Sequence, residues 1–194
     1  MVYLKTPSSG LLHGDEHQID VCLMAGAQLE LRTQACTLVY PGRSRQSLVV
    51  KLGKASTFKF QPHSLILASA AELRQRVDIH LSEGASLNYQ EDWCAGRIGM
   101  GECWQFKSFD YGLNIWQDDD LIYRERWILT PSTQELTSAF ICSSYTHFRT
   151  SFVFGKRDQS MAPEQPPNSA APGRQKRWIM ETAQAKVERF ASQS

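Results

Sequence analysis

The sequence has no long hydrophobic run. Its longest apolar stretch, around Ser64 to Ala71, covers a handful of residues, far short of the ~20 needed for a membrane-spanning helix. The N-terminal segment MVYLKTPSSG also lacks the basic start and the apolar stretch of about 7 to 15 residues that mark a secretory signal. The sequence therefore predicts no membrane association and a cytoplasmic location.

Cysteine pairs are also missing. The five cysteines are odd in number, widely spread and form no C-x-x-C motif, at Cys22, Cys36, Cys94, Cys103 and Cys142. This pattern argues against a disulfide framework and against a thiolate zinc site. We expect free, mostly buried thiols in a reducing compartment, so any metal chemistry must depend mainly on Asp, Glu and His.

An excess of one charge is absent as well. The chain has 21 basic and 20 acidic residues, so it has no overall field that would attract nucleic acid or an anionic membrane. It contains no G-x-x-x-x-G-K-[ST], G-x-G-x-x-G or G-x-S-x-G motif. We therefore expect no nucleic-acid binding, no resident nucleotide chemistry and no serine-hydrolase elbow.

What the sequence does contain is alternation of apolar and polar residues with period two, from Gln18 to Ile128. Ile19, Val21 and Leu23 begin this pattern, which is typical of half-buried strands. Only the stretch from Ala70 to Val77 is expected to form a helical turn or two. We predict a mostly β fold with few short helices.

A unit of about 30 residues recurs three times. VCLMAGAQLEL begins at Val21, VVKLGKASTFKF at Val49 and IHLSEGASLNY at Ile79, and their turn alanines lie 28 and then 30 residues apart, at Ala27, Ala55 and Ala85. Repetition at this length favours a helix-like spiral of stacked strands or hairpins. Three unrelated hairpins in a β-sandwich are the alternative.

One short motif, H-x-x-E-H at His13, Glu16 and His17, has the spacing of an inverted zinc peptidase. Such a site needs a helix, because only there do residues four apart both face one ion. Gly10 and Gly14 flank the motif, and a strand pattern follows it, so a helix has no room. The sequence argues against a metallopeptidase.

Glu125 lies between Arg124 and Arg126 in the strand pattern LIYRERWIL. Neighbouring residues of a strand point to opposite faces, so Glu125 faces the interior if both arginines face solvent. A buried carboxylate needs a partner. An internal ion pair and a cation-binding site are equally consistent with the sequence.

The composition changes after Phe154. Residues 155–174 are rich in Pro, Ser, Gln and Ala, and we predict a disordered linker there. Residues 175–194 return to helical spacing, with apolar residues at Ile179, Ala183, Val187 and Phe190. We therefore predict a β domain over residues 1–154, a linker, and an amphipathic helical tail.

Four segments occur in a fixed order: SSGLLHGDEHQIDV from Ser8, LELRTQACTLVY from Leu29, GASLNYQEDWCAGRIGMGECWQF from Gly84 and LIYRERWIL from Leu121. The first three resemble a G-G-[LV]-x-G-G-D turn, an L-x-T-Q-A-[AS]-T-K-x-Y strand and a G-A-x-L-x-x-x-[ED]-x-x-x-x-G-R-x-x-x-G-E segment. These are motifs of the UreD family of urease accessory proteins, also called UreH. The resemblance runs from about residue 3 to about residue 154.

The resemblance implies a spiral β fold and a chaperone without catalytic turnover. Family members bind apo-urease and, through UreF, the GTPase UreG. Their complex delivers Ni²⁺ to urease through a water-filled internal passage lined by polar and acidic residues, with the ion in transit rather than held as a permanent cofactor. Oxygen ligands suit this task because they release a divalent ion that thiolates would retain.

Matched position by position, the resemblance gives candidate residues for this passage: Asp15, Thr33, Gln34, Glu91 and Glu125, with His13, His17 and Asp92 as weaker candidates. The sequence departs from the family pattern at His13, where a small residue is usual, and at Leu38, where Lys is usual. The family also has additional residues before Tyr3 and a longer C-terminal part, so the chain is expected to be a shortened or divergent member.

Two other functions fit the sequence. One is an enzyme on a β-solenoid that uses paired carboxylates such as Glu91 and Asp92 as acid and base. This interpretation fails if the two side chains lie on opposite faces of a strand. The other is an interaction module without metal handling.

Overall fold

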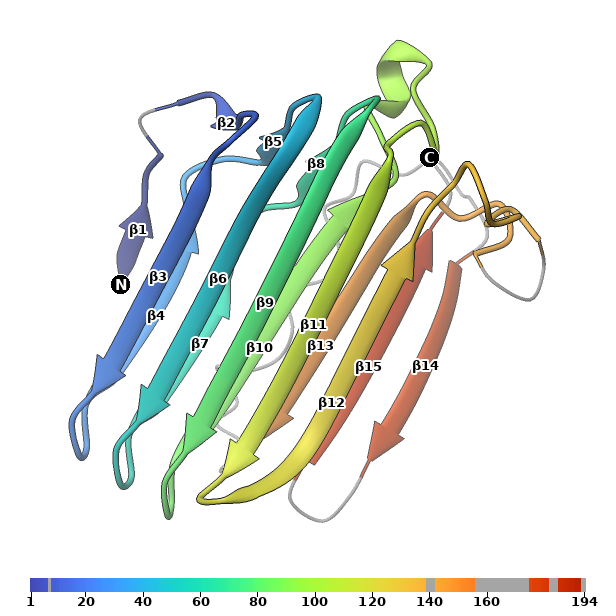
Figure 1. Ribbon diagram of the computed structural model, residues 1–194. Coiled ribbons are helices and arrows are strands. Elements are labelled where there is room, and N and C mark those ends of the chain that lie inside the picture. The colour runs from blue at the N-terminus through green and yellow to red at the C-terminus, as the bar shows by residue number, and fades with distance from the viewer. Residues whose placement is uncertain (7, 139–141, 156–174, 182–184, 193–194) are drawn as a thin grey trace.

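The computed structural model describes residues 1–6, 8–138, 142–155, 175–181 and 185–192, and it is built almost entirely of strands. Two sheets face each other (Figure 1). The elements are β1 (Val2–Leu4), β2 (Gly10–Leu11), β3 (Glu16–Leu23), β4 (Gln28–Thr33), β5 (Thr37–Val39), β6 (Gly42–Leu52), β7 (Thr57–Gln61), β8 (Leu65–Leu67), β9 (Ala71–Leu81), β10 (Ser86–Cys94), the 3₁₀ turn η1 (Ile98–Met100), β11 (Ser108–Gln117), β12 (Asp120–Leu129), β13 (His147–Phe154), β14 (Gln175–Glu181) and β15 (Ala185–Ser192).

The first eleven strands form a β-solenoid of about three turns. In the five-stranded sheet, β3, β6, β9 and β11 pair in parallel, and in the ten-stranded sheet, β4, β7 and β10 do the same. Successive coils match in register, so that Ile19, Leu48 and Val77 lie side by side. The predicted spiral is confirmed, and the β-sandwich of separate hairpins is wrong because the repeats pair with one another in parallel.

The repeated alanines mark the turns between the two sheets. The Thr57 amide donates to the Ala27 carbonyl at 2.8 Å, and the Ala55 amide donates to the Glu83 carbonyl at 3.0 Å. Each turn therefore bonds to the turn of the next coil. Ala55 adopts a left-handed backbone with φ of 53°, a conformation that glycine tolerates better than alanine does.

The short helix expected from Ala70 to Val77 is wrong. Ala70 is a turn residue, and residues 71–77 belong to β9, where Leu73, Val77 and Ile79 are buried on one face. The inward face of β9 continues the register of β6 over its whole length. Pairing with both neighbouring coils therefore overrides the weak local preference for a helix.

The C-terminal part of the described chain closes the fold with antiparallel strands. β12 returns along β11, β13 pairs with β10, and β15 lies between β13 and β14 (Figure 1). The helical tail expected at residues 175–194 is wrong, because β14 and β15 are strands. The backbone groups along the open side of β13 need partners, and β15 supplies them over eight residue pairs. The predicted linker, apart from Gly155, lies outside the described residues.

The core fills the space between the two sheets. Phe58, Ile79, Leu87 and Leu113 have no exposed surface. Trp93 lies at the centre of an aromatic cluster and stacks on Phe148 with ring centroids 4.2 Å apart. This apolar interior makes any polar side chain inside it significant, because burying a polar group without a partner is costly.

The cysteines fit the expectation of free thiols only in part. None forms a disulfide, but only Cys94 and Cys142 are buried, whereas Cys22 and Cys36 are exposed. Within the described ranges, no helix has the length and hydrophobicity needed to cross a membrane.

Candidate functional site: a polar row through the solenoid

A row of polar side chains crosses the apolar interior. His17, Gln46 and Gln75 occupy matching positions on β3, β6 and β9, and Tyr111 continues the row on β11. They share the inward face of their strands with buried residues such as Leu48 and Val77, which lie two positions further along. With strands about 4.8 Å apart, the row spans roughly 14 Å across the coils.

Glu91 extends towards this row from the opposite sheet. One oxygen accepts a hydrogen bond from Gln75 Nε2, and the other accepts from the hydroxyl of Tyr89. The Tyr89 hydroxyl also lies 3.4 Å from that of Tyr111. Glu91 is 8% exposed and has no ion-pair partner among the described residues.

The environment of Glu91 favours its protonated form. Burial raises the pKa of its carboxyl group from 4.5 to about 7, although the bonds from Tyr89, Tyr111 and Gln75 act in the opposite direction. The charge of Glu125 contributes to the rise. Near neutral pH, Glu91 is therefore poised between a neutral acid and an anion without a counter-ion.

A small cavity lies against Glu91. Its volume is about 40 Å³, counted as space open to the centre of a water molecule, and the polar residues that border it are Thr33, Thr37, Gln46, His63, Gln75, Arg76, Glu91 and Asp92. A water needs about 10 to 15 Å³ by this measure, so two or three fit. The buried Oε1 of Gln75 has no hydrogen-bond partner among the residues that the structure describes. The cavity therefore offers oxygen ligands to water or to a small cation.

Glu125 is buried at the far end of the polar region, as the strand alternation predicted. It is 4% exposed, and Arg124 and Arg126 both face solvent. Tyr123 donates to one oxygen at 2.9 Å, and Arg189 Nη2 lies 3.3 Å from the other, which also accepts from Trp127 Nε1. The internal ion pair is therefore the correct alternative for Glu125.

Glu91 and Asp92 lie on opposite faces of β10. Glu91 contacts the facing sheet, whereas Asp92 receives two bonds of 2.6 Å from Arg149, its cross-strand neighbour on β13. Two carboxylates on opposite faces cannot act on one bond as acid and base. The hypothesis of an enzyme that uses Glu91 and Asp92 as its acid and base is therefore wrong.

Asp15 and His17 lie at the open end of the polar row. Asp15 Oδ2 accepts from the Leu12 amide at 2.9 Å, in a turn that Gly14 makes with φ of 88°, and lies 3.9 Å from His17 Nε2. Both side chains are about one-third exposed. His13 faces away to accept from the Arg43 amide at 3.1 Å.

Thr33 and Gln34 separate in the structure. The Thr33 hydroxyl lines the cavity and accepts from the His63 amide at 2.7 Å, whereas Gln34 is exposed at the end of β4. The structure thus connects Asp15, His17, Thr33 and Glu91 to one polar region. It does not connect His13 or Gln34 to this region, and Asp92 borders the cavity while its carboxylate bonds to Arg149. Nowhere in the described part of the chain do three His, Cys, Asp or Glu residues form a metal-binding group.

Sequence reasoning missed Gln46, Gln75, His63 and Arg189. Gln46 and Gln75 did carry a signal, since they lie 29 residues apart at inward positions of two repeats. His63 and Arg189 carried none, because one is in a loop and the other is on a strand predicted as a helix.

Comparison with known proteins identifies the family of this chain. The family model described as UreD urease accessory protein matches residues 1–188. The chain belongs to the UreD family. The match extends beyond residue 154, where the sequence resemblance ended, and includes β14 and the first half of β15.

Individual relatives support the same family. Urease accessory protein UreD 2 of Synechococcus sp. (strain JA-3-3Ab) is 46% identical over 116 residues, which cover 60% of this chain and 43% of the relative. UreD of Lachnoclostridium phytofermentans is 26% identical, covering 82% of this chain and 60% of the relative. UreH of Helicobacter hepaticus is 24% identical, covering 84% and 66%. The chain thus spans 43% to 66% of the length of these relatives, all of which are named urease accessory proteins.

Proposed function

We propose that this chain is a cytoplasmic maturation scaffold for urease, which binds apo-urease together with UreF-type and UreG-type partners and passes Ni²⁺ towards the urease active site. Membership of the UreD family supports the connection to urease. The metal cargo and the partners are the proposal.

The observation that carries the metal role is Glu91 at the cavity. Within the described ranges, this buried carboxylate has no counter-ion and the neighbouring Gln75 Oε1 has no hydrogen-bond partner, and the cavity has space for two or three waters. A divalent cation that has lost most of its water shell would fit this space, compensate the charge and take these oxygens as ligands. Asp15 and His17 provide a solvent-accessible entrance to the same row.

The ligand set suits transit rather than storage. Carboxylate, carboxamide and hydroxyl oxygens bind Ni²⁺ more weakly than thiolates do, and one carboxylate cannot hold the ion firmly. The nearest cysteines are not part of the cavity lining. At the far end, Arg189 neutralises Glu125, so an ion that passes there requires this pair to open.

The test is urease activation in cells that lack the native gene and carry variants of it. Glu91→Gln keeps the size of the side chain but removes its charge, and Glu83→Gln, at an exposed turn, is the matched control. We expect Glu91→Gln to co-purify with apo-urease normally while the urease contains less nickel and has less activity.

A second candidate, a scaffold without metal handling, is favoured by the neutralised Glu125 and by the lack of a three-residue metal group in the described ranges. It predicts normal nickel content with Glu91→Gln. Normal urease activation after deletion of the whole gene would refute both candidates.

A further inference from the structure

The outer face of the five-stranded sheet carries an unusual arrangement of charge. The outward positions of β6, β9, β11 and β12 alternate with the core positions, and many hold arginine: Arg43, Arg45, Arg74, Arg76, Arg124 and Arg126. The chain as a whole has a net charge of only +1. Over the whole face, carboxylates at other outward positions balance most of this charge, namely Glu16, Asp20, Asp78 and Asp120. The positive excess is therefore local, around Asp110 and Glu72.

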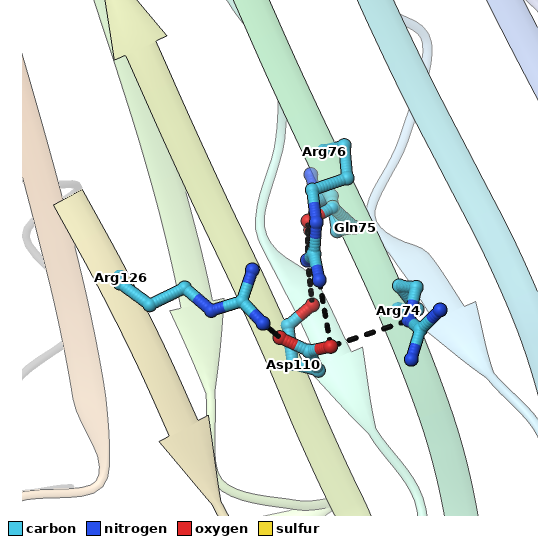
Figure 2. A network of polar contacts seen from close by, with 5 residues as sticks. All are labelled: Arg74, Gln75, Arg76, Asp110 and Arg126. Atoms are coloured by element: carbon cyan, nitrogen blue, oxygen red, sulfur yellow. Dashed lines mark hydrogen bonds and ion pairs between the residues drawn. The ribbon is translucent and has the colours of Figure 1, made fainter. Parts of the chain in front are cut away.

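Three of these arginines converge on Asp110 of β11 (Figure 2). Arg76 Nη2 bonds to Oδ2 at 2.7 Å, and Arg126 Nη2 lies 2.6 Å from Oδ1. Arg74 approaches with Nε at 3.2 Å. A Cβ on Gly112 would meet Arg76 and Arg126 at 3.3 Å, so this glycine leaves the space in which both side chains lie across the sheet.

A second carboxylate repeats the pattern nearby. Glu72 on β9 bonds to Lys107 Nζ at 2.5 Å and lies 3.6 Å from Arg43 Nη2. Five cations thus surround two carboxylates, Asp110 and Glu72, and leave an excess of three positive charges. Both carboxylates stay ionised: for Asp110, burial raises the pKa, but the bond and charge of Arg76 and the charges of Arg126 and Arg74 outweigh this and lower it.

The carboxylates lie beneath the cations. Each carboxylate side chain is 20% exposed, whereas four of the cationic partners are 44% to 70% exposed, at Arg43, Arg74, Arg126 and Lys107. Among the described residues, Arg74 gives only Nε to Asp110 and Arg126 only Nη2. Their remaining N–H groups face solvent and match the geometry of a carboxylate ligand.

Exposed apolar residues lie on the same face. Ile128 is opposite Asp110 in the register of β11 and β12 and is 58% exposed, and Ile122 is 38% exposed further along β12. Arginine next to exposed apolar side chains is typical of protein interfaces, whereas a nucleic-acid surface requires a more basic domain. Five strands about 4.8 Å apart and about 30 Å long present roughly 700 Å², close to the roughly 800 Å² per partner of a standard interface.

We infer that the outer face of the five-stranded sheet, centred on Arg74, Arg126 and Ile128, is a docking surface for an acidic surface of a protein partner. The inference rests on the proposed function, because the partner is then one of the proteins of urease maturation. The remaining N–H groups of Arg74 and Arg126 pair with carboxylates of the partner, and Ile128 packs against the partner within the same contact.

The test uses the full chain and measures its affinity for two purified proteins, the urease apoprotein and the UreF-type protein of the same organism. Arg74→Glu with Arg126→Glu reverses two exposed charges and leaves Arg76 in place. Lys5→Glu with Lys54→Glu makes the same change of charge on exposed residues away from this face. Thermal unfolding of both variants verifies that they fold.

We expect the arginine pair to weaken binding to one of the two proteins by at least about tenfold at low salt, and the lysine pair by less than about threefold. The difference should shrink at about 0.5 M salt, because screening weakens exposed charge pairs. Replacing Ile128 with Asp should weaken the same complex.

The outcomes separate the two proposals. If the unmodified chain binds neither protein, the proposed function fails, and this inference fails with it. If binding occurs but the arginine pair does not weaken it more than the lysine pair does, only the docking surface is refuted. Binding to anionic vesicles and to duplex DNA is measured in parallel. If the arginine pair weakens only one of these and neither protein complex, the docking surface is also refuted.

Discussion

Replacing Glu91 with Gln is expected to stabilise the protein at neutral and alkaline pH. Glu91 is buried without a counter-ion, so its ionised form is unfavourable in the folded state. Gln retains an oxygen that accepts from Tyr89. Its new amide replaces the oxygen that accepts from Gln75 Nε2, so the Gln75 amide must turn over and present Oε1 as the acceptor. The substitution thus removes a charge and keeps the shape.

The size of the effect follows from the pKa. Burial raises the pKa of Glu91 from 4.5 to about 7, which corresponds to a destabilisation of about 3 kcal/mol once the group is ionised in both states. Because the folded state holds the proton more tightly, the favourable contribution of Glu91 is complete below about pH 4.5 and is lost as the pH rises to about 7. The advantage of the variant should therefore grow over this window and remain constant above it.

Denaturant unfolding at several pH values between 5 and 9 measures this difference, and Glu83→Gln serves as the exposed control. At pH 8 the variant should be more stable by up to about 3 kcal/mol, or about 6 to 12 °C in Tm for a chain of this size. At pH 5 the gain should be much smaller. A difference that does not change with pH, or a variant less stable than wild type at pH 8, would refute the assignment of Glu91 as an uncompensated buried acid.

Three further changes test other parts of the structure. Ni²⁺ at pH 8 should raise the Tm of wild type but not of Glu91→Gln, because a cation at the cavity removes the cost of the buried charge; equal shifts would show binding elsewhere. Arg189→Met should cost about 1 to 3 kcal/mol in denaturant unfolding because the buried Glu125 loses a cation that is itself 40% exposed; adding Glu125→Gln should recover most of this loss, and no recovery would contradict this account. Ala55→Gly should raise stability by about 0.5 to 1 kcal/mol because Ala55 has a φ of 53°; a lower Tm would contradict that account.

The solenoid was predictable because its signals repeat. The alternation from Gln18 to Ile128 and the alanines at Ala27, Ala55 and Ala85 reflect the same physical requirement, an inward face and a turn in each coil. The inward direction of Glu125 followed from the same alternation. Such features are local, so the sequence displays them directly.

The errors concern features that depend on distant pairing. The spacing of Val187 and Phe190 suits a helix, but β15 is held as a strand by the open side of β13, some 35 residues earlier in the chain. For the same reason, the Arg189–Glu125 pair could not be predicted. Local periodicity does not report which strand edges the rest of the fold leaves unpaired.

The two buried carboxylates illustrate how similar sequence signals lead to different roles. Both Glu91 and Glu125 face the interior and accept hydrogen bonds from aromatic side chains. Glu125 also has the Arg189 guanidinium, so its charge is balanced within the protein. Glu91 instead has a cavity, and its balance must come from a proton or from a cation that enters. A residue whose replacement stabilises the fold is expected to be retained for function, and the joint prediction is that Glu91→Gln gains stability at pH 8 while urease in the same cells loses nickel.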